Sequence, residues 1–196
     1  MAAKKETYLI EGARIALRGL RTGDLKSVTR WINEPDTAYY MGVATPVTTA
    51  SQKKWFDAMQ SDESKRVFAV VLRRTGRHIG NIGLSNISGR DRNAMLNIFI
   101  GGAADRGKGY AREAMLLALY YCFNSLGLNR VWLILHADNK AALRLYESVG
   151  MRREGVLRKH EQYGGKYVDK IVMGILKSDF EEVMKPDATA RPAGVK

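Results

Sequence analysis

The 196-residue sequence predicts an α+β fold with a mixed, mostly antiparallel central sheet flanked by helices. Strand patterns come first, in a run separated by short turns, and a strand–helix–strand–helix unit follows them. The chain then closes with a hairpin around a Gly-Gly turn. We expect one domain over residues 12–178, an N-terminal extension over 1–11, and a C-terminal tail over 179–196 that is disordered from about residue 185.

Hydrophobic periodicity divides the first half of the chain into a strand, two helices and a three-strand meander. The first helix should stop before Pro35, because proline cannot continue a helix. Thr49 and Gln52 match a capping box, so a second helix should begin there. The expected elements are, in order, a strand at 14–20, a helix at 24–33, the helix from Thr49, and strands at 66–73, 77–86 and 94–100.

A long amphipathic helix is the clearest element of the second half. The apolar residues spaced for one face of it are Met115, Ala118, Leu119, Cys122, Phe123 and Leu126. Gly127 should end this helix, and Gly150 should end a shorter one. The remaining expected elements are a strand at 130–135, a helix at 139–149, and hairpin strands at 156–163 and 166–176. A right-handed crossover should join the strands on either side of the long helix.

The net charge of +12 and the pI near 9.9 favour acidic partners, such as a phosphorylated cofactor, RNA or an acidic protein surface. The basic residues come in short, scattered groups, unlike a dedicated nucleic-acid surface. The single cysteine, Cys122, excludes an internal disulfide and a thiolate metal cage. The sequence has no apolar leader and no apolar run long enough to span a membrane. We therefore expect a cytoplasmic protein with no membrane partner.

A loop rich in glycine, over residues 99–111, joins an apolar strand to the long helix. Such a junction presents free N–H groups at the positive end of a helix dipole, and it predicts a site for a phosphate group. A nucleoside triphosphate loop does not fit, because Gly109 stands where the magnesium-binding Ser or Thr belongs. A dinucleotide fingerprint does not fit either, because Arg112 replaces its third glycine and no opening Rossmann strand precedes it.

Two motifs resemble those of the GCN5-related N-acetyltransferase (GNAT) superfamily. Arg106-x-x-Gly109-x-Ala111 is similar to its (Q/R)-x-x-G-x-(G/A) signature at a strand–helix junction. The stretch 139–151 is similar to its N-x-x-A-x-x-L-Y-x-x-x-G-F motif, with Met151 in place of Phe. The resemblance extends over residues 12–178, and the closing hairpin resembles that of the branch that acetylates ribosomal-protein N-termini. It implies a GNAT-like sheet whose fourth and fifth strands splay around the cofactor.

The resemblance implies acetyl-CoA as co-substrate, with its pyrophosphate on the main chain of the glycine loop. Gly107 and Gly109 would let the phosphates approach the backbone, and Arg106 and Lys108 would add positive charge. The pantetheine arm would lie along the fourth strand, which carries a bulge and leaves the fifth strand there. The implied cofactor-binding residues are Ile98, Phe99, Ile100, Arg106, Gly107, Lys108, Gly109, Tyr110, Ala111 and Asn139, the last also a helix cap.

By the same resemblance, Tyr146 is the catalytic acid that protonates the departing CoA thiolate. Many relatives carry a glutamate base where this chain has Met95, which cannot take a proton. At pH 7, deprotonation costs about 1.4 kcal/mol for an α-amine but roughly 4–5 kcal/mol for a lysine-like amine. A site without a strong base therefore suits a weakly basic amine. A water relay through Asn97, His136 or Asp169 is the alternative.

The acceptor pocket should form from the segment between the first two helices and from the closing hairpin. The candidate acceptor residues are Trp31, Tyr39, Tyr40, His160 and Glu161. We predict an N-acetyltransferase, monomeric or homodimeric, that works by direct attack in a ternary complex, with no metal and no covalent intermediate at Cys122. The favoured acceptor is a protein N-terminal amine of the ribosomal type. The alternatives are a small-molecule amine (aminosugar, polyamine or antibiotic) and a non-catalytic RNA- or ribosome-binding module.

Overall fold

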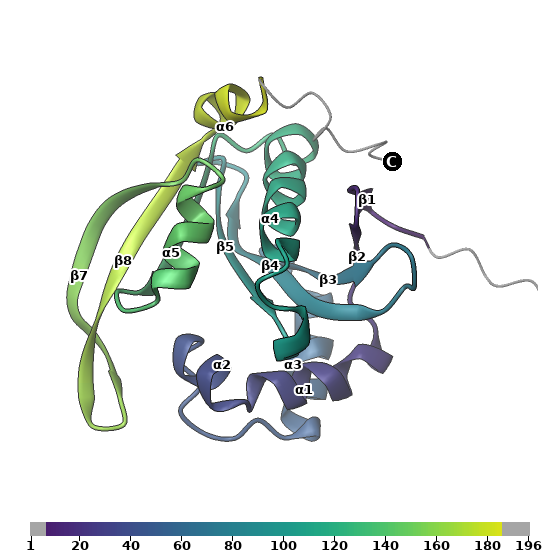
Figure 1. Cartoon of the computed structure of the whole chain (residues 1–196), viewed down its shortest axis with the longest axis vertical. Helices are drawn as coiled ribbons and strands as arrows, with labels where there is room; N and C mark the ends of the chain where they lie inside the picture. The colour runs from purple at the N-terminus through teal and green to yellow at the C-terminus, as the bar shows by residue number, and fades with distance from the viewer. Residues whose placement is uncertain (1–6, 186–196) are drawn as a thin grey trace, which may run out of the picture.

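The computed structural model describes residues 7–185, and these form an eight-stranded sheet in the order β1-β2-β3-β4-β5-β6-β8-β7 (Figure 1). Neighbouring strands are antiparallel except for β5 and β6, which run parallel. The strands are β1 (Ile10–Glu11), β2 (Ile15–Gly19), β3 (Arg66–Leu72), β4 (His78–Ser88), β5 (Asn93–Ile100), β6 (Arg130–His136), β7 (Arg152–Tyr163) and β8 (Lys166–Leu176). The predicted mixed, mostly antiparallel α+β fold is confirmed.

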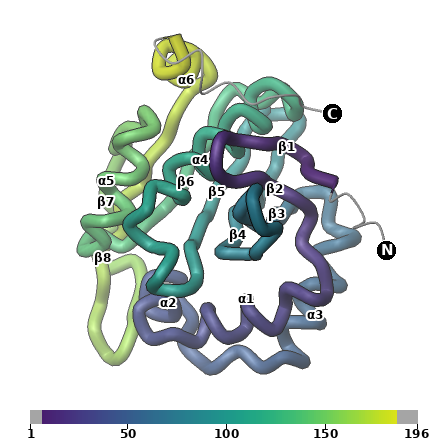
Figure 2. Tube along the Cα trace, turned by 45° about the vertical axis from the view of Figure 1, so that its right-hand side comes forward, coloured from purple at the N-terminus to yellow at the C-terminus, as the bar shows by residue number. Residues whose placement is uncertain are grey.

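Helices cover both faces of the sheet and build two cores (Figure 2). They are α1 (Leu25–Ile32), α2 (Pro35–Tyr40), α3 (Thr49–Gln60), α4 (Tyr110–Tyr120), α5 (Lys140–Glu147) and α6 (Lys177–Met184). The larger core joins α4, α5 and α6 to one face, where Met115, Leu119 and Phe123 from the predicted stripe are buried. The smaller core packs α1 and α3 on the other face through Val28, Phe56 and their neighbours. The sheet therefore separates an α4–α5 side from an α1–α3 side.

The structure differs from the sequence-based expectations in the cap of α3 and in the role of Pro35. Thr48, not Thr49, caps α3: its hydroxyl accepts from the Ser51 N–H (3.1 Å), and the Ser51 hydroxyl accepts from the Thr48 N–H (3.0 Å). The capping box with Gln52 was therefore wrong by one residue. Pro35 does lie beyond the end of α1, but it also begins α2, because proline is well suited to the first position of a helix.

The two ends of the described chain carry elements that periodicity did not predict. Ile10 and Glu11 pair with β2, and Ile10 is fully buried, although this segment was expected to be an extension. At the other end, α6 packs Phe180 into the larger core. The long helix also changes to a π-helical turn over Tyr121–Ser125 before it reaches Gly127. The expected tail from residue 186 onward and residues 1–6 lie outside the described residues.

Strands β5 and β6 pair over only three residues each and then part. The paired residues are Asn93–Met95 on β5 and 130–132 on β6, so the second half of each strand has no partner on that side. This confirms the predicted splay. The expected bulge lies elsewhere: the register between β4 and β5 shifts after Ser85, and Asn86 on β4 adopts a positive φ of 51°. The extra residue is thus on β4 and not on the splayed strand.

Candidate active site

The glycine loop leaves the splayed end of β5 and enters α4 with a row of exposed N–H groups. Gly107 and Gly109 have φ angles of +73° and +79°, a region that favours glycine. Gly109 is the N-cap of α4, so the N–H groups from 109 to 112 have no acceptor within the helix. Within residues 7–185, no backbone group accepts from the N–H of Gly107 or Lys108 either. The Arg106 N–H, in contrast, donates to the Ala103 carbonyl (3.2 Å).

Two ion pairs from distant strands hold this loop in place. Arg77 forms a two-pronged pair with the buried carboxylate of Asp105 (2.7 and 2.7 Å), which lowers the pKa of Asp105. Glu113, in the first turn of α4, accepts from the backbone N–H of Arg14 (2.7 Å) and from its Nε (3.0 Å). The Arg14 guanidinium also donates to the Lys108 carbonyl (2.9 Å). The free N–H groups of residues 107–112 form a backbone cradle. This cradle is shaped by tertiary contacts that the sequence analysis did not include.

The two cations of the loop differ in their contacts. Arg106 turns toward α2: its Nε donates to the Ile100 carbonyl (3.1 Å), and its Nη2 donates to Glu34 (3.0 Å) and to Thr37 (3.1 Å). The Lys108 side chain is exposed and makes no hydrogen bond or ion pair with the described part of the chain. Lys108 is thus available to an anion in the cradle, whereas Arg106 is already engaged with protein.

The backbone of Ile98, Phe99 and Ile100 lies beyond the point where β5 leaves β6. It pairs with β4 on one side and has no strand partner on the other. Tyr110 and Ala111, half-buried in the first turn of α4, follow the cradle directly. The predicted cofactor residues of this stretch are therefore contiguous in space, from the open edge of β5 to the start of α4.

Helix α5 carries the two remaining residues that the motif indicated. The Asn139 side chain accepts from the Ala142 N–H (3.0 Å) and so caps the helix, as predicted. Tyr146 is 7% exposed, and its hydroxyl has no hydrogen-bond partner among the described residues. Burial raises the pKa of Tyr146 to about 12. The phenol therefore keeps its proton at all physiological pH values.

A buried charge cluster lies at the far end of β6, on the α1–α3 side of the sheet. His136 is 1% exposed, and its Nε2 lies 3.1 Å from a carboxylate oxygen of Glu161 on β7. The other Glu161 oxygen pairs with Lys170 of β8 (2.5 Å). Burial opposes ionisation of Glu161, but Lys170 and then His136 outweigh it and hold its pKa below the ordinary value. The carboxylate is therefore charged at neutral pH.

Aromatic rings from α2 and the hairpin cover this cluster. The Tyr39 ring lies 4.6 Å from that of His136 and 5.1 Å from that of Tyr163, both edge-to-face, and Tyr40 stands beside it. The Tyr39 hydroxyl donates to the exposed carboxylate of Asp138 (2.7 Å), and this hydrogen bond raises the pKa of Tyr39 to about 12. Aromatic faces and carboxylates thus gather where α2 meets the hairpin of β7 and β8, which Figures 1 and 2 show side by side.

Two of the predicted acceptor residues lie outside this aromatic group. Trp31 is buried, and its ring lies flat against Gly101, where an added Cβ would come within 2.1 Å of the ring. His160 is exposed, in a bulge of β7 between Leu157 and Glu161. Tyr39, Tyr40 and Glu161, in contrast, come together around His136. The sequence indicated His136 only as one of three relay residues, because its partners are far away along the chain.

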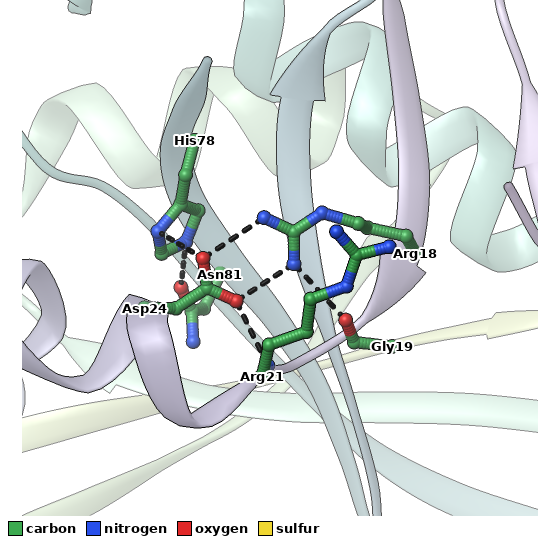
Figure 3. Close-up of polar contacts among 6 residues, drawn as sticks. All are labelled: Arg18, Gly19, Arg21, Asp24, His78 and Asn81. Atoms are coloured by element: carbon green, nitrogen blue, oxygen red, sulfur yellow. Dashed lines mark hydrogen bonds and ion pairs between the residues drawn. The ribbon is translucent and has the colours of Figure 1, made fainter. Parts of the chain in front are cut away.

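Behind Trp31, a buried polar cluster fixes α1 to the sheet (Figure 3). Arg18 of β2 donates to both carboxylate oxygens of Asp24 (2.7 and 2.8 Å), and both side chains are buried. His78 of β4 lies 3.5 Å from Asp24 through Nδ1 and 2.7 Å from Asn81 through Nε2. Because the Arg18–Asp24 pair is buried and bonded within the protein, we read this cluster as a support for α1 and not as a reacting centre.

No group of three or more His, Cys, Asp or Glu residues is placed to hold a metal ion within 7–185. No helix in that range is both long and apolar enough to cross a membrane. Cys122 is buried in the π-helical turn that follows α4, and burial raises the pKa of its thiol to about 12, so the thiolate required of a nucleophile is disfavoured.

The chain belongs to the GNAT acetyltransferase family: the model of the acetyltransferase (GNAT) domain matches residues 14–152. It is 28% identical to the uncharacterized N-acetyltransferase p20 of Bacillus licheniformis, over 85% of this chain and 95% of that one. It is 29% identical to the spermidine N(1)-acetyltransferase of Vibrio cholerae, over 86% and 96% of the two chains. The crystal structure of spermidine N-acetyltransferase from Vibrio cholerae with CoA and spermine superposes with a TM-score of 0.81, covering 86% of this chain and 98% of that one at 28% identity.

These comparisons establish an acetyl-CoA-dependent N-acetyltransferase with the GNAT fold. They do not support the narrower prediction of the ribosomal-protein branch, because the relatives named for a substrate are spermidine acetyltransferases. That prediction rested on the closing hairpin, which is a pattern of two strands and a turn. Such a pattern specifies a hairpin and not an acceptor. The branch prediction was thus too narrow, and the superfamily prediction is confirmed.

Proposed function

We propose that this N-acetyltransferase transfers the acetyl group of acetyl-CoA to a primary amine of a small polycationic molecule, of the polyamine class, by direct attack in a ternary complex. One observation carries the choice of acceptor: three tyrosine rings and the Asp138 and Glu161 carboxylates gather at one end of the splayed strands. Aromatic faces and carboxylates attract ammonium groups. Spermidine acetyltransferases with similar chains, such as the one of Vibrio cholerae, point to the same class.

The net charge of +12 weighs less than this local arrangement. Charges more than about 10 Å apart are screened at physiological salt, so the side chains lining the site decide what it binds. Much of the positive charge lies elsewhere on the surface, in exposed residues such as Arg74, Arg90 and Arg158. A polycation is therefore compatible with a basic protein, provided that the acceptor end of the site is acidic.

In the proposed complex, the N–H groups of residues 107–112 hold the cofactor's pyrophosphate, and Lys108 adds a charge from the loop surface. The pantetheine arm lies along the unpaired edge of Ile98–Ile100, where backbone groups can pair with its amides. The arm ends with the thioester at the gap between the splayed strands, so that Tyr146 of α5 approaches it from one face of the sheet and the acceptor beside His136 from the other. The proposed binding site uses main-chain groups for the cofactor and side chains for the chemistry.

The reaction forms one C–N bond and breaks one C–S bond. The neutral amine nitrogen attacks the thioester carbonyl carbon, and the tetrahedral intermediate expels the CoA thiolate. Tyr146 donates its phenolic proton to the sulfur, because a thiolate of pKa about 8.5 leaves more easily when it is protonated as it departs. The proton lost by the amine returns to solvent through a base, and the phenol is reprotonated from solvent.

We assign the base to His136. Its Nε2 lies 3.1 Å from Glu161, and its Nδ1 lies 4.0 Å from the Asp138 carboxylate; we assign the hydrogen to Nε2, so that Nδ1 carries the lone pair. Nδ1 is buried and has no hydrogen-bond partner in the described chain. The other two relay candidates are less suitable. The Asn97 amide cannot accept a proton at neutral pH, and Asp169 accepts the Lys159 N–H (2.7 Å) in the hairpin bulge.

An acceptor panel tests the proposal. CoA release is followed with a thiol reagent for spermidine, spermine, an aminoglycoside, and peptides that begin with Ala, Ser or Gly. We expect the polyamines to give the highest kcat/KM. We expect Asp138→Asn to raise their KM several-fold, and the matched exposed carboxylate variant on α3, Asp57→Asn, to leave it unchanged. Faster turnover of the peptides would overturn the acceptor class.

The base assignment has its own test. His136→Gln keeps a donor toward Glu161 but lacks a titrating nitrogen, so kcat should fall by about 10²-fold. The kcat/KM for the polyamines should fall with it. His160→Gln removes an exposed imidazole from the hairpin bulge and should change neither. A kcat in His136→Gln that stays within twofold of wild type would exclude His136 as the base.

A further inference from the structure

Arg106, a residue of the cofactor-loop motif, makes its side-chain contacts with the acceptor side of the molecule. Its guanidinium donates to the Ile100 carbonyl at the end of β5 and to Glu34 and Thr37 at the start of α2. Thr37 is buried, and Arg106 and Glu34 are each about one-third exposed. Three directed bonds thus use three partners that are 6, 72 and 69 residues away along the chain. The side chain is oriented by the fold and is not an extended surface cation.

Helix α2 is held at both of its ends. At its start, Glu34 and Thr37 are bonded to Arg106. At its end, the Tyr39 hydroxyl is bonded to Asp138, which directly precedes the cap of α5. Just beyond it, Gly42 lies so near the Glu161 carboxylate that an added Cβ would be 3.1 Å from it. This two-turn helix therefore connects the cofactor loop with the residues around His136.

The neighbouring segment is packed against the same loop. Trp31, at the end of α1, lies flat on Gly101, and its ring also contacts those of Phe99 and His78. Gly101 connects the splayed end of β5 to the glycine loop. The turn that leads from α1 into α2 thus has little freedom to move independently of the loop.

We propose that Arg106 is a positioning residue that couples the cofactor loop to α2, and through α2 sets the affinity of the site for the acceptor amine. This rests on the proposed function insofar as the acceptor binds beside Tyr39 and His136. When the pyrophosphate occupies the backbone cradle, the loop becomes more ordered, and Arg106 transmits that order to α2 through Glu34 and Thr37. Because such coupling is reciprocal, a bound acceptor tightens the cofactor site by the same factor.

The other role for Arg106 is direct contact with the pyrophosphate. Its three bonds would have to break for that role, whereas Lys108 two residues later is exposed and unengaged with the described chain. The backbone donors of 107–112 also serve the anion without it. The geometry thus divides the two cations of the motif between two tasks, one for the phosphate and one for α2.

The first test measures CoA affinity by calorimetry and acceptor KM at saturating acetyl-CoA, for the amine that turns over fastest. Removing the link in Arg106→Met, or its partner in Glu34→Ala, should raise acceptor KM by about fivefold, with the CoA dissociation constant within about twofold of wild type. The double variant should be no worse than either single one, because both remove the same contact. The loop control Lys108→Met should weaken CoA and leave acceptor KM unchanged.

The second test does not depend on the acceptor. Hydrogen exchange is measured on the peptide that covers α2, with and without CoA. CoA should increase protection of this peptide in wild type, and the increase should vanish in Arg106→Met and Glu34→Ala although CoA is still bound. Either of two results overturns the proposal. One is that Arg106→Met behaves like Lys108→Met while Glu34→Ala is neutral, and the other is that CoA leaves α2 protection unchanged in wild type. If the proposed acceptor class is wrong, the acceptor panel described above will show it. The hydrogen-exchange result on α2 can be interpreted independently of that outcome.

Discussion

Replacing Tyr146 by phenylalanine should slow acetyl transfer by about 10²- to 10³-fold and leave the fold almost unchanged. The ring of Tyr146 is 7% exposed and packs in the larger core, and phenylalanine keeps that packing. The hydroxyl has no partner among the described residues, so the substitution breaks no hydrogen bond. The free energy of unfolding should change by less than about 1 kcal/mol, which is a shift of less than about 4 °C in Tm.

The size of the kinetic effect follows from the pKa of the phenol. Burial raises it to about 12, whereas an ordinary thiol has a pKa of about 8.5, so the transfer starts about 5 kcal/mol uphill. A thiolate expelled into the same buried place is destabilised as well, so the pKa of the thiol also rises. The difference between the two pKa values therefore becomes smaller as the C–S bond breaks. The tyrosine therefore helps only while the thiolate is forming, which is how a general acid acts, and its loss should reduce kcat more than it alters CoA binding.

Three measurements separate these effects: thiol release for kcat, calorimetry for the CoA dissociation constant, and thermal unfolding for stability. Because a phenol of pKa about 12 keeps its proton, wild-type kcat should show no alkaline loss from this group below about pH 11. A Tyr146→Phe enzyme that turns over within twofold of wild type, with normal CoA affinity, would refute the acid role and leave Tyr146 as a packing residue.

Three further predictions concern stability. Glu161→Gln leaves the buried Lys170 unpaired and should lower the free energy of unfolding by about 3 kcal/mol. Because the pKa of Glu161 is lowered in the folded state, the wild-type carboxylate stabilises the fold above about pH 4, and this stabilisation is lost as pH falls through the lowered pKa. Acid unfolding curves of the variant should lack this loss of stability. Gly101→Ala should lower Tm by several degrees because its Cβ would lie 2.1 Å from the Trp31 ring. The control Gly102→Ala has open space around it and should leave Tm unchanged. Equal Tm values for the two variants would contradict the packing argument. Cys122 should resist thiol reagents until the chain unfolds, and because burial raises its pKa to about 12, stability should fall as pH rises from about 9 toward 12; rapid native labelling would disprove its burial.

Local pattern was sufficient for most of the fold. The apolar stripe from Met115 to Phe123 packs on the sheet, and Asn139 caps α5, because both features depend on residues within two turns of one another. The cap of α3 was misplaced by one residue because Thr48, Thr49 and Ser51 all carry hydroxyls that can cap a helix, and only backbone geometry separates them. Helix α2 was missed because six residues are too few to show a period.

The acceptor side was less predictable. Tyr39, Tyr40 and Glu161 were identified by resemblance, but their meeting at His136 depends on how α2 approaches the hairpin. The ion pair of Glu161 with Lys170 crosses a register shift in β7 and β8, which an alternating pattern does not reveal. The preference for a protein N-terminus came from Met95, the net charge and the resemblance of the closing hairpin, and none of these observations includes the carboxylates that tertiary structure brings to the site.

The sequence by itself determined the order of strands and helices, the glycine-rich entry to α4, and the family, since each is encoded in short stretches of chain. Tertiary structure alone decided the partners of the charged residues: Arg106 with Glu34, Arg77 with Asp105, and Glu161 with Lys170. The physical reason is that charge attraction acts through space between side chains that the folded backbone has already brought close. Periodicity records which face of an element is apolar, and carries no information about which distant charge will lie opposite.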